Sequence, residues 1–264
     1  MRRSRLAAYV STLLLAVAAV LTGTGTAHAA TAPYVALGDS YSSGVGAGSY
    51  ISSSGDCKQS TKAYPYLWAA AHSPSSFSFK ACSGARTGDV LANQLGTLTT
   101  STGLVSISIG GNDAGFSDVM TTCVLQSDSA CLSRINTAKA YVDSTLPGQL
   151  DNVYSAISGK APNAHVVVLG YPRFYKLGTT CVGLSETKRK AINDAADYLD
   201  TATAKVAADH GFTFGDVRST FTGHELCSGS AWLHSLNLLN IGESYHPTAS
   251  GQSGGYLPVL TSAA

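Results

Sequence analysis

Charge is scarce in this sequence. Lys, Arg, Asp and Glu make up 12% of its 264 residues, and 17 basic residues nearly balance 16 acidic ones. The basic excess that would favour nucleic acid or an anionic membrane as partner is therefore absent. The zinc-ligand spacing C-x-x-C is also absent, and His224-Glu225 has no second histidine four residues after the first, so no metal or other cofactor is expected. The chain has no internal repeat, no long linker and, after residue 22, no apolar segment long enough to cross a membrane.

The first 29 residues have the three parts of a secretory signal peptide. A basic start, Met1–Arg5, precedes an apolar stretch over residues 6–22 and the small-residue pattern Ala27-His28-Ala29. We expect cleavage after Ala29 and export to the extracellular space, because this apolar stretch is short for a membrane anchor and no stop-transfer pattern follows it. Removing its three arginines leaves 14 basic against 16 acidic residues, a net charge of about −2. Residues 30–264 have the length of a single α/β domain.

The exported part contains six cysteines. An even number in an oxidising compartment predicts three disulfides, whose pairing sequence alone leaves open. The pairings that give the shortest loops are Cys123 with Cys131, Cys57 with Cys82, and Cys181 with Cys227. The first of them would enclose a short polar loop. The disulfides and the low charge content together predict a stable extracellular monomer.

Short apolar runs alternate with helical patterns along the chain. The predicted strands begin at Tyr34 and cover 77–81, 104–109, 166–169 and 212–214. The predicted helices cover 64–71, 87–95, 115–122, 133–146, 149–157, a stretch from Ser185 to about Gly211, and 248–260, with Pro147 breaking or kinking the chain between the fourth and fifth. This alternation predicts an α/β fold with a central parallel sheet of about five strands and helices on both faces.

Polar residues directly follow three of these strands. Gly38-Asp39-Ser40 ends the first, Cys82-Ser83-Gly84 the second and Gly110-Gly111-Asn112 the third. The carboxyl ends of parallel strands lie at one edge of a sheet, so these segments are expected to converge. A hydroxyl nucleophile with N–H donors for an oxyanion is the set that acyl transfer needs. The first segment does not match G-x-S-x-G, because Ser42 occupies its last position, which argues against the ordinary α/β-hydrolase fold.

A base for Ser40 must come from elsewhere in the chain. His246 lies in Ser244-Tyr245-His246-Pro247, just before the last predicted helix, where proline restrains the local backbone. His234, in Trp232-Leu233-His234, is the competing candidate. His165 borders a strand and His210 ends a helix, where a cation is favourable for structural reasons.

These blocks resemble the SGNH (GDSL-type) hydrolase superfamily, named after Ser, Gly, Asn and His. Gly38-Asp39-Ser40 matches its first block, Gly84 the second, Gly110-Gly111-Asn112-Asp113 the third and His246-Pro247 the last. Their order and spacing cover nearly the whole chain after residue 29. The length and six cysteines are most similar to secreted actinomycete lipases, esterases and phospholipases A1 of this superfamily. The resemblance implies a flavodoxin-like, three-layer α/β/α sandwich and metal-free ester hydrolysis.

The resemblance also implies a role for each block. Ser40 would attack the ester carbonyl and His246 would take its proton. The N–H groups of Ser40 and Gly84 and the amide of Asn112 would form the oxyanion hole. Two alternatives remain open for the group that orients His246: the carboxylate of Glu243, or the backbone carbonyl of Ser244. The name GDSL stands for Gly-Asp-Ser-Leu, and this chain has Tyr41 at the position of the leucine. Asp39 is interpreted as a turn or helix-start residue.

The substrate class is the least defined part of the prediction. We expect an acyl ester, with lipase, esterase, phospholipase A1 and carbohydrate acetyl esterase as alternatives, and a non-catalytic secreted binding protein as the competing class. Aromatic and apolar residues of the long loops are candidates for an acyl-binding wall; they are Tyr41, Tyr50, Phe116, Phe174, Trp232 and Leu236.

Overall fold

Five parallel strands form the sheet to which the predicted functional residues are attached. The computed structural model describes residues 32–264, so the predicted signal peptide, residues 1–29, lies outside the described residues. The strand order is β2-β1-β3-β4-β5, the flavodoxin-like order, and every pair is parallel. The predicted α/β/α fold class is confirmed. The strands are β1 (Tyr34–Gly38), β2 (Phe77–Phe79), β3 (Leu104–Ser108), β4 (His165–Leu169) and β5 (Thr213–Gly215).

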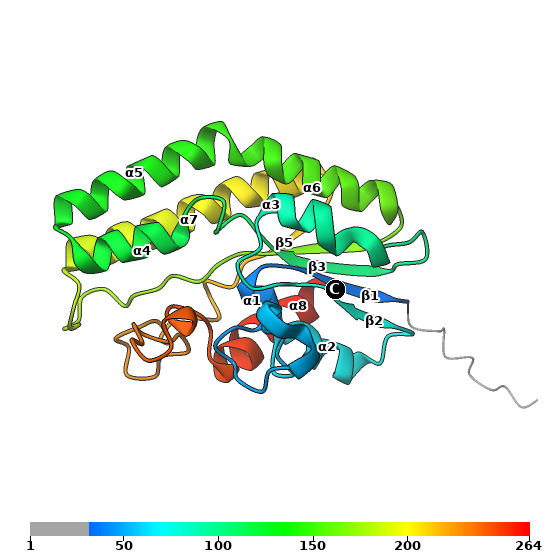
Figure 1. Cartoon of the computed structure of the whole chain (residues 1–264), viewed down its shortest axis with the longest axis horizontal. Coiled ribbons are helices and arrows are strands. Elements are labelled where there is room, and N and C mark those ends of the chain that lie inside the picture. Colours follow the sequence, from blue (N-terminus) through cyan, green and yellow to red (C-terminus); the bar gives the residue numbers. More distant parts are fainter. Residues whose placement is uncertain (1–31) are drawn as a thin grey trace, which may run out of the picture.

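Helices cover both faces of this sheet. In Figure 1, α3 (Thr87–Asp89), α6 (Leu146–Lys160) and α7 (Glu186–Asp209) lie on one face, while α2 (Tyr64–His72) and α8 (Leu257–Ala263) lie on the other. The central strands are therefore buried on both sides, which explains why β1 and β4 are apolar without polar alternation. A one-turn helix, α1 (Ser40–Ser43), follows β1 at once.

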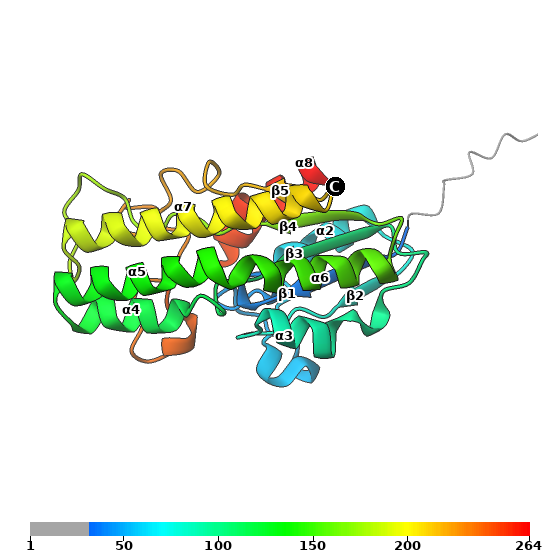
Figure 2. The same ribbon diagram turned by 90° about the horizontal axis from the view of Figure 1, so that it is seen from above.

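Three helices extend beyond the sheet. They are α4 (Phe116–Leu125), α5 (Asp128–Ser144) and the N-terminal part of α7, which project past the strand ends in both Figure 1 and Figure 2. The 24 residues of α7 span about 36 Å at 1.5 Å per residue, whereas a five-residue strand spans about 17 Å. We call the projecting parts of α4, α5 and α7 the overhang.

The boundary between α4 and α5 differs from the sequence prediction. The stretch between Cys123 and Cys131 was expected to be a loop, but α4 continues to Leu125 and α5 begins at Asp128. The Ser127 hydroxyl accepts a hydrogen bond from the N–H of Ala130 and caps the new helix, and an acidic residue follows in its first turn. The disulfide thus joins two helices across a tight turn and does not enclose a polar loop.

The predicted closing helix begins with a wider coil. Residues Gly251–Tyr256 form π-type turns before α8 starts at Leu257. A Cβ atom at Gly255 would lie 2.1 Å from the ring of Phe221, so glycine lets this segment pass close to the core.

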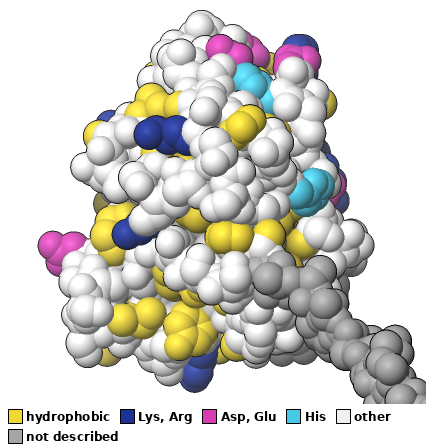
Figure 3. Space-filling model, turned by 90° about the vertical axis from the view of Figure 1, so that its right-hand side faces the viewer, with side chains coloured by type: hydrophobic (Ala, Val, Ile, Leu, Met, Phe, Trp, Pro, Cys, Tyr) yellow, Lys and Arg dark blue, Asp and Glu magenta, His cyan; other side chains and the backbone are white. Residues whose placement is uncertain are grey.

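Three disulfides hold the long connections. They join Cys57 to Cys82, Cys123 to Cys131 and Cys181 to Cys227, the pairings that short loops favour. Within residues 32–264, no helix has both the length and the apolar character needed to cross a bilayer. Figure 3 shows one end of the molecule, where charged side chains of both signs are sparse among uncharged atoms.

Candidate active site

Ser40 and His246 meet at the carboxyl edge of the sheet. Asp39 accepts a hydrogen bond from the N–H of Tyr41 and caps α1, so Ser40 is the first helical residue after β1. The Oγ of Ser40 lies 2.7 Å from Nε2 of His246. The other ring nitrogen, Nδ1, lies 3.1 Å from the carbonyl oxygen of Ser244. Because a carbonyl can only accept, Nδ1 carries the proton and Nε2 is free to accept from the serine hydroxyl.

Glu243 is not placed against the imidazole. Its Oε1 accepts a hydrogen bond from the hydroxyl of Tyr50 at 2.7 Å, and that hydroxyl accepts from the N–H of Gly46. Of the two alternatives left open by the sequence, the Ser244 carbonyl contacts the imidazole and the Glu243 carboxylate does not. The reason is local, because Glu243 ends a 3₁₀ turn whose geometry directs its side chain toward the loop after α1.

The surroundings keep His246 neutral. Burial removes water that would stabilise the charged imidazolium, and this lowers the pKa of His246 to about 4. The hydrogen bond to the Ser244 carbonyl raises the pKa and offsets only part of the decrease. At neutral pH the ring is therefore unprotonated at Nε2, the form that a general base needs. The competing base, His234, has its Nε2 2.7 Å from the carbonyl of Gly46 and makes no hydrogen bond to Ser40.

The Gly84 and Asn112 segments lie together. An amide N–H of Asn112 donates to the carbonyl of Ala85 at 3.0 Å, and the carboxylate of Asp113 accepts from both the N–H and the hydroxyl of Thr87. Gly84 has a φ of +76°, a conformation that favours glycine. Within residues 32–264, the N–H groups of Ser40 and Gly84 donate to no other protein group. These donors and the second N–H of the Asn112 amide are available to an anion.

Sequence reasoning missed Tyr171, which connects these segments. Its hydroxyl donates to Oδ2 of Asp39 at 2.5 Å and accepts from the N–H of Gly111 at 3.2 Å. The other Asp39 oxygen accepts from the hydroxyl of Ser108. Burial raises the pKa of Asp39 to about 6. The signal was present in Gly170-Tyr171-Pro172, a fourth polar strand end at the same edge of the sheet.

An apolar cavity opens beside Ser40 and Asn112. It runs between α4, α5 and α7, inside the overhang. Besides the polar groups near Ser40, its lining is almost entirely apolar, and Lys139 is the one cation that the described residues contribute to it. The apolar lining is Ala114, Phe116, Val119, Met120, Ala138, Val142, Phe174, Ile192, Ala195, Ala196 and Leu199.

The predicted acyl-binding wall lies only partly on this cavity. Tyr41, Phe116 and Phe174 line it. Tyr50 instead binds Glu243, and Trp232 stacks on His224 with ring centres 3.6 Å apart. Leu236 borders a separate hollow. These three were misplaced because loop side chains carry no periodicity that would reveal which way they face.

Among the described residues, no group of three or more His, Cys, Asp or Glu side chains is arranged to hold a metal ion. The residues that meet at the sheet edge are a hydroxyl, a neutral imidazole and N–H donors, next to an apolar cavity. This arrangement can perform nucleophilic acyl transfer with proteinaceous groups alone.

Comparison with known proteins agrees with the arrangement. Lipase 1 of Streptomyces coelicolor is 78% identical over 268 aligned residues that cover both chains completely. The crystal structure of a phospholipase A1 from Streptomyces albidoflavus superposes with a TM-score of 0.88 at 67% identity, covering 89% of this chain and 100% of that one. An extracellular lipase from Streptomyces rimosus gives 0.87 at 68% identity, with the same coverage. The model of the GDSL-like lipase/acylhydrolase family matches residues 36–253, and the chain belongs to this family.

Proposed function

We propose that this protein is an exported serine hydrolase that cleaves carboxylic esters of lipids through an acyl-enzyme on Ser40. One observation carries the proposal: the Ser40 hydroxyl is 2.7 Å from a neutral His246, whose far nitrogen is oriented by the Ser244 carbonyl. A serine hydroxyl hydrogen-bonded to a histidine of lowered pKa, beside an apolar cavity, is typical of a catalytic site and is not expected of an ordinary turn serine.

The proposed reaction has two halves. His246 Nε2 takes the hydroxyl proton as Ser40 Oγ bonds to the ester carbonyl carbon. The negative oxygen that forms is held by the N–H groups of Ser40 and Gly84 and the Asn112 amide. The intermediate collapses when His246 protonates the departing alkoxide, leaving an acyl-serine. Water then attacks that acyl group with His246 again as base, which releases the carboxylic acid and restores Ser40.

The cavity supports a lipid acyl chain as the acid part of the ester. Its apolar lining would bury methylene groups at about 0.8 kcal/mol each, and a long acyl chain offers many of them whereas an acetyl group offers none. The relatives at 66–78% identity are described as lipases, and one similar structure as a phospholipase A1. A phospholipid is therefore the second candidate substrate, whereas the lining disfavours a carbohydrate acetyl ester.

Export and domain organisation belong to the same proposal. Residues 1–29 are proposed to be a signal peptide and residues 30–264 one hydrolase domain. The description of the Streptomyces rimosus relative as extracellular supports this. Protein recovered from the culture medium should begin within a residue or two of Ala30, as N-terminal sequencing would determine.

The test is hydrolysis by the purified protein beside its Ser40→Ala variant, with p-nitrophenyl esters of short and long chain, a triacylglycerol, a diacylphospholipid and an acetylated sugar. We expect Ser40→Ala to abolish all activity. Asn112→Ala should lower turnover roughly 10²–10³-fold, as for one oxyanion donor. Glu243→Ala should stay near the parent rate, because its carboxylate does not touch His246. Equal rates for Ser40→Ala and the parent would refute the proposal.

A further inference from the structure

The segment that precedes His246 displays leucines to solvent. Residues 236–241, here called the leucine turn, include Leu238, Leu239 and Ile241, which are 82%, 100% and 63% exposed. The turn is held by specific hydrogen bonds: Oδ1 of Asn237 accepts from the N–H groups of Leu239 and Asn240. The hydroxyl of Ser244 accepts from the N–H of Asn237. These bonds hold apolar side chains in water, where they contribute nothing to the stability of the fold.

Two other segments place apolar side chains beside the turn. Leu125, at the end of α4, is 75% exposed, and Val182, in the loop before α7, is 97% exposed. The adjoining Val124 and Leu236 border one hollow together with Val182. We call the leucine turn, Leu125 and Val182 the apolar rim. All three segments lie at the end of the molecule where the helices overhang the sheet (Figure 1).

The hollow inside the rim adjoins the candidate active site. Tyr245, which lines the hollow, packs its ring against those of Phe116 and Phe174, at 6.5 Å between centres in both cases. Both phenylalanines line the cavity beside Ser40. The leucine turn also runs directly into Ser244 and His246. The ring of Tyr245 thus contacts two side chains of the cavity lining from the side of the hollow.

Charge at the rim does not select an anionic partner. The ammonium group of Lys188 is buried, where it donates to the carbonyl of Gln126 and lies 3.7 Å from Asp128. The guanidinium of Arg189 donates hydrogen bonds to the backbone carbonyls of Lys176 and Thr179. The charges nearby are of both signs: Lys176 and Glu186 are exposed, Asp128 is half-buried, and the ammonium of Lys58 lies against Gly242 next to the turn. An anionic membrane surface would call for a cluster of exposed cations, whereas a zwitterionic or neutral one requires only apolar insertion.

We infer that the apolar rim docks the protein on the surface of zwitterionic lipid aggregates, with Leu238 and Leu239 inserted among the lipid chains. The inference rests on the proposed function, in that the aggregate is the source of the ester. Separate protruding side chains suit a fluid surface that closes around each of them, and a protein partner would instead need a groove shaped to receive them.

Flotation with phosphatidylcholine vesicles tests the inference. All proteins carry Ser40→Ala, so that the lipid is not consumed and binding is measured apart from catalysis. Leu238→Ser with Leu239→Ser removes the apolar groups, and Leu238→Met with Leu239→Met is the matched control that keeps them. We expect the serine pair to partition at least roughly tenfold more weakly than the parent, and the methionine pair to match it. Equal unfolding temperatures would show that both pairs are folded.

Each arm has an outcome that overturns the inference. Equal partitioning of the serine and methionine pairs would mean that the leucine turn does not enter the lipid. Binding only to vesicles with anionic lipid would mean that charge, not the rim, makes the contact. A leucine-dependent dimer without vesicle binding would assign the rim to a second copy of the chain. Vesicle binding by the Ser40→Ala protein, together with no ester hydrolysis by the protein that keeps Ser40, would support docking and count against the proposed role of Ser40.

Discussion

The side-chain hydroxyl of Tyr41, the residue after Ser40, is hydrogen-bonded to the backbone of Tyr245, the residue before His246. It donates to the backbone carbonyl of Tyr245 at 2.7 Å, and the Tyr41 ring centre lies 5.3 Å from that of His246. Tyr245 has a φ of +66°, a left-handed conformation that non-glycine residues seldom adopt. Because Tyr245 lies between Ser244 and His246, its conformation determines how the Ser244 carbonyl meets the imidazole.

Replacing this hydroxyl should therefore impair chemistry more than binding. Tyr41→Phe keeps the ring but leaves the Tyr245 carbonyl without its donor. We expect kcat to fall roughly tenfold, the equivalent of one buried hydrogen bond, with KM nearly unchanged. Steady-state kinetics on a soluble ester measure both. Tyr66→Phe, at a tyrosine 37% exposed on α2, is the control. A change confined to KM would show that Tyr41 acts only as cavity lining.

The lowered pKa of His246 predicts activity at unusually acidic pH. The base works only when neutral, and its pKa lies at about 4 instead of 6.5. Protonation of His246 therefore removes activity as the pH falls through about 4, and the titration of His246 should give no acid limb between pH 5 and 8. A pH profile on a soluble ester, with fluorescence confirming that the protein remains folded, provides the measurement. An acid limb centred near 6.5 would contradict the prediction.

At the residue scale, the sequence predicts the polar groups attached to strand ends and little else. Ser40, Gly84 and Asn112 could be named because each comes after an apolar run that stops abruptly. His246 could be named because proline fixes its surroundings. The sequence could not decide whether Glu243 or Ser244 orients His246. The answer depends on the left-handed backbone of Tyr245 and on Tyr50, whose hydroxyl donates a hydrogen bond to the Glu243 carboxylate. Tyr171 comes after β4 in the same way as Ser40 comes after β1, but an aromatic residue at such a position is usually part of the core.

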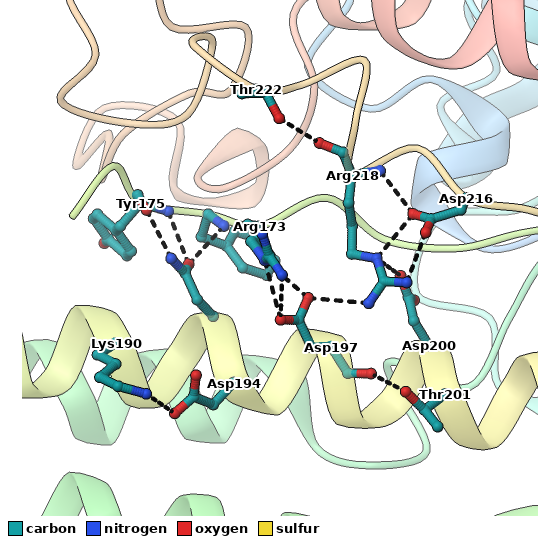
Figure 4. A network of polar contacts seen from close by, with 12 residues as sticks. Arg173, Tyr175, Lys190, Asp194, Asp197, Asp200, Thr201, Asp216, Arg218 and Thr222 are labelled. Carbon is teal, nitrogen blue, oxygen red and sulfur yellow. Dashed lines mark hydrogen bonds and ion pairs between the residues drawn. The ribbon is translucent and has the colours of Figure 1, made fainter.

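Helix α7 is tied to two strand ends by charged side chains, as Figure 4 shows. Asp197 on α7 accepts from Arg173, which follows β4, and from Arg218, which follows β5. Asp200, one turn further on, is fully buried and accepts from the N–H of Tyr171 at 2.9 Å. Its second oxygen has no hydrogen-bond donor among the described residues, and Arg218 lies 3.8 Å away. Burial raises the pKa of Asp200 to about 8.

This pKa makes the stability of the fold depend on pH. The folded protein keeps the Asp200 proton up to about pH 8, whereas an unfolded chain loses it near 3.8. Between these values folding takes up a proton, so the free energy of unfolding should decrease as the pH rises. Asp200→Asn should reduce the loss of stability between pH 5 and pH 8 in urea denaturation. Asp194→Asn, at an exposed ion pair on the same helix, should leave it unchanged. If the free energy of unfolding changed equally with pH in the parent and both variants, Asp200 would not be the group responsible.

The packing of α5 on α7 should control which acyl chains are accepted. Ala138 on α5 and Ala196 on α7 are both buried and line the cavity. Ala138→Leu would fill part of it, so we expect the long-chain to short-chain rate ratio to fall roughly tenfold. Rates on p-nitrophenyl esters of increasing length measure the ratio. Ala140→Leu, at an exposed position of the same helix, is the matched control. An unchanged ratio would place the acyl chain outside this cavity.

At the element scale, periodicity located the five strands and the long helices, because burial imposes it. It failed where a few residues decide a boundary. Ser127 starts α5 earlier than the apolar pattern does, and the glycines of 251–256 open the coil before α8. Both features depend on single side chains or their absence, which a window of many residues averages away.

The whole molecule should be a monomer in solution away from lipid. Three disulfides restrain its long connections, and its surface carries few charges, of both signs, on the end seen in Figure 3. Light scattering coupled to size exclusion, on the mature Ser40→Ala protein, should give the mass of one chain. Twice that mass over a range of concentrations would contradict the expectation.

The overall architecture could be predicted from the order of the elements, because parallel strands joined by helices allow few topologies. The substrate could not be predicted in this way. The cavity proposed for its acyl part depends on how distant helices pack, which no local pattern encodes. The long loops 177–185 and 223–247 take their conformation from a disulfide and from single hydrogen bonds. Those loops carry no apolar periodicity.

The overhang divides the molecule into two parts that can evolve at different rates. The proposed nucleophile and oxyanion donors follow strand ends at the sheet edge, and the proposed base His246 is hydrogen-bonded to Ser40 there. The cavity wall is carried by α4, α5 and α7. Asp197 and Asp200 tie α7 to strand ends, whereas Cys123–Cys131 fastens α4 and α5 to each other. Mutations on α4 and α5 can therefore accumulate with less effect on the sheet. Related proteins can therefore come to accept different acyl chains while they keep the same reaction.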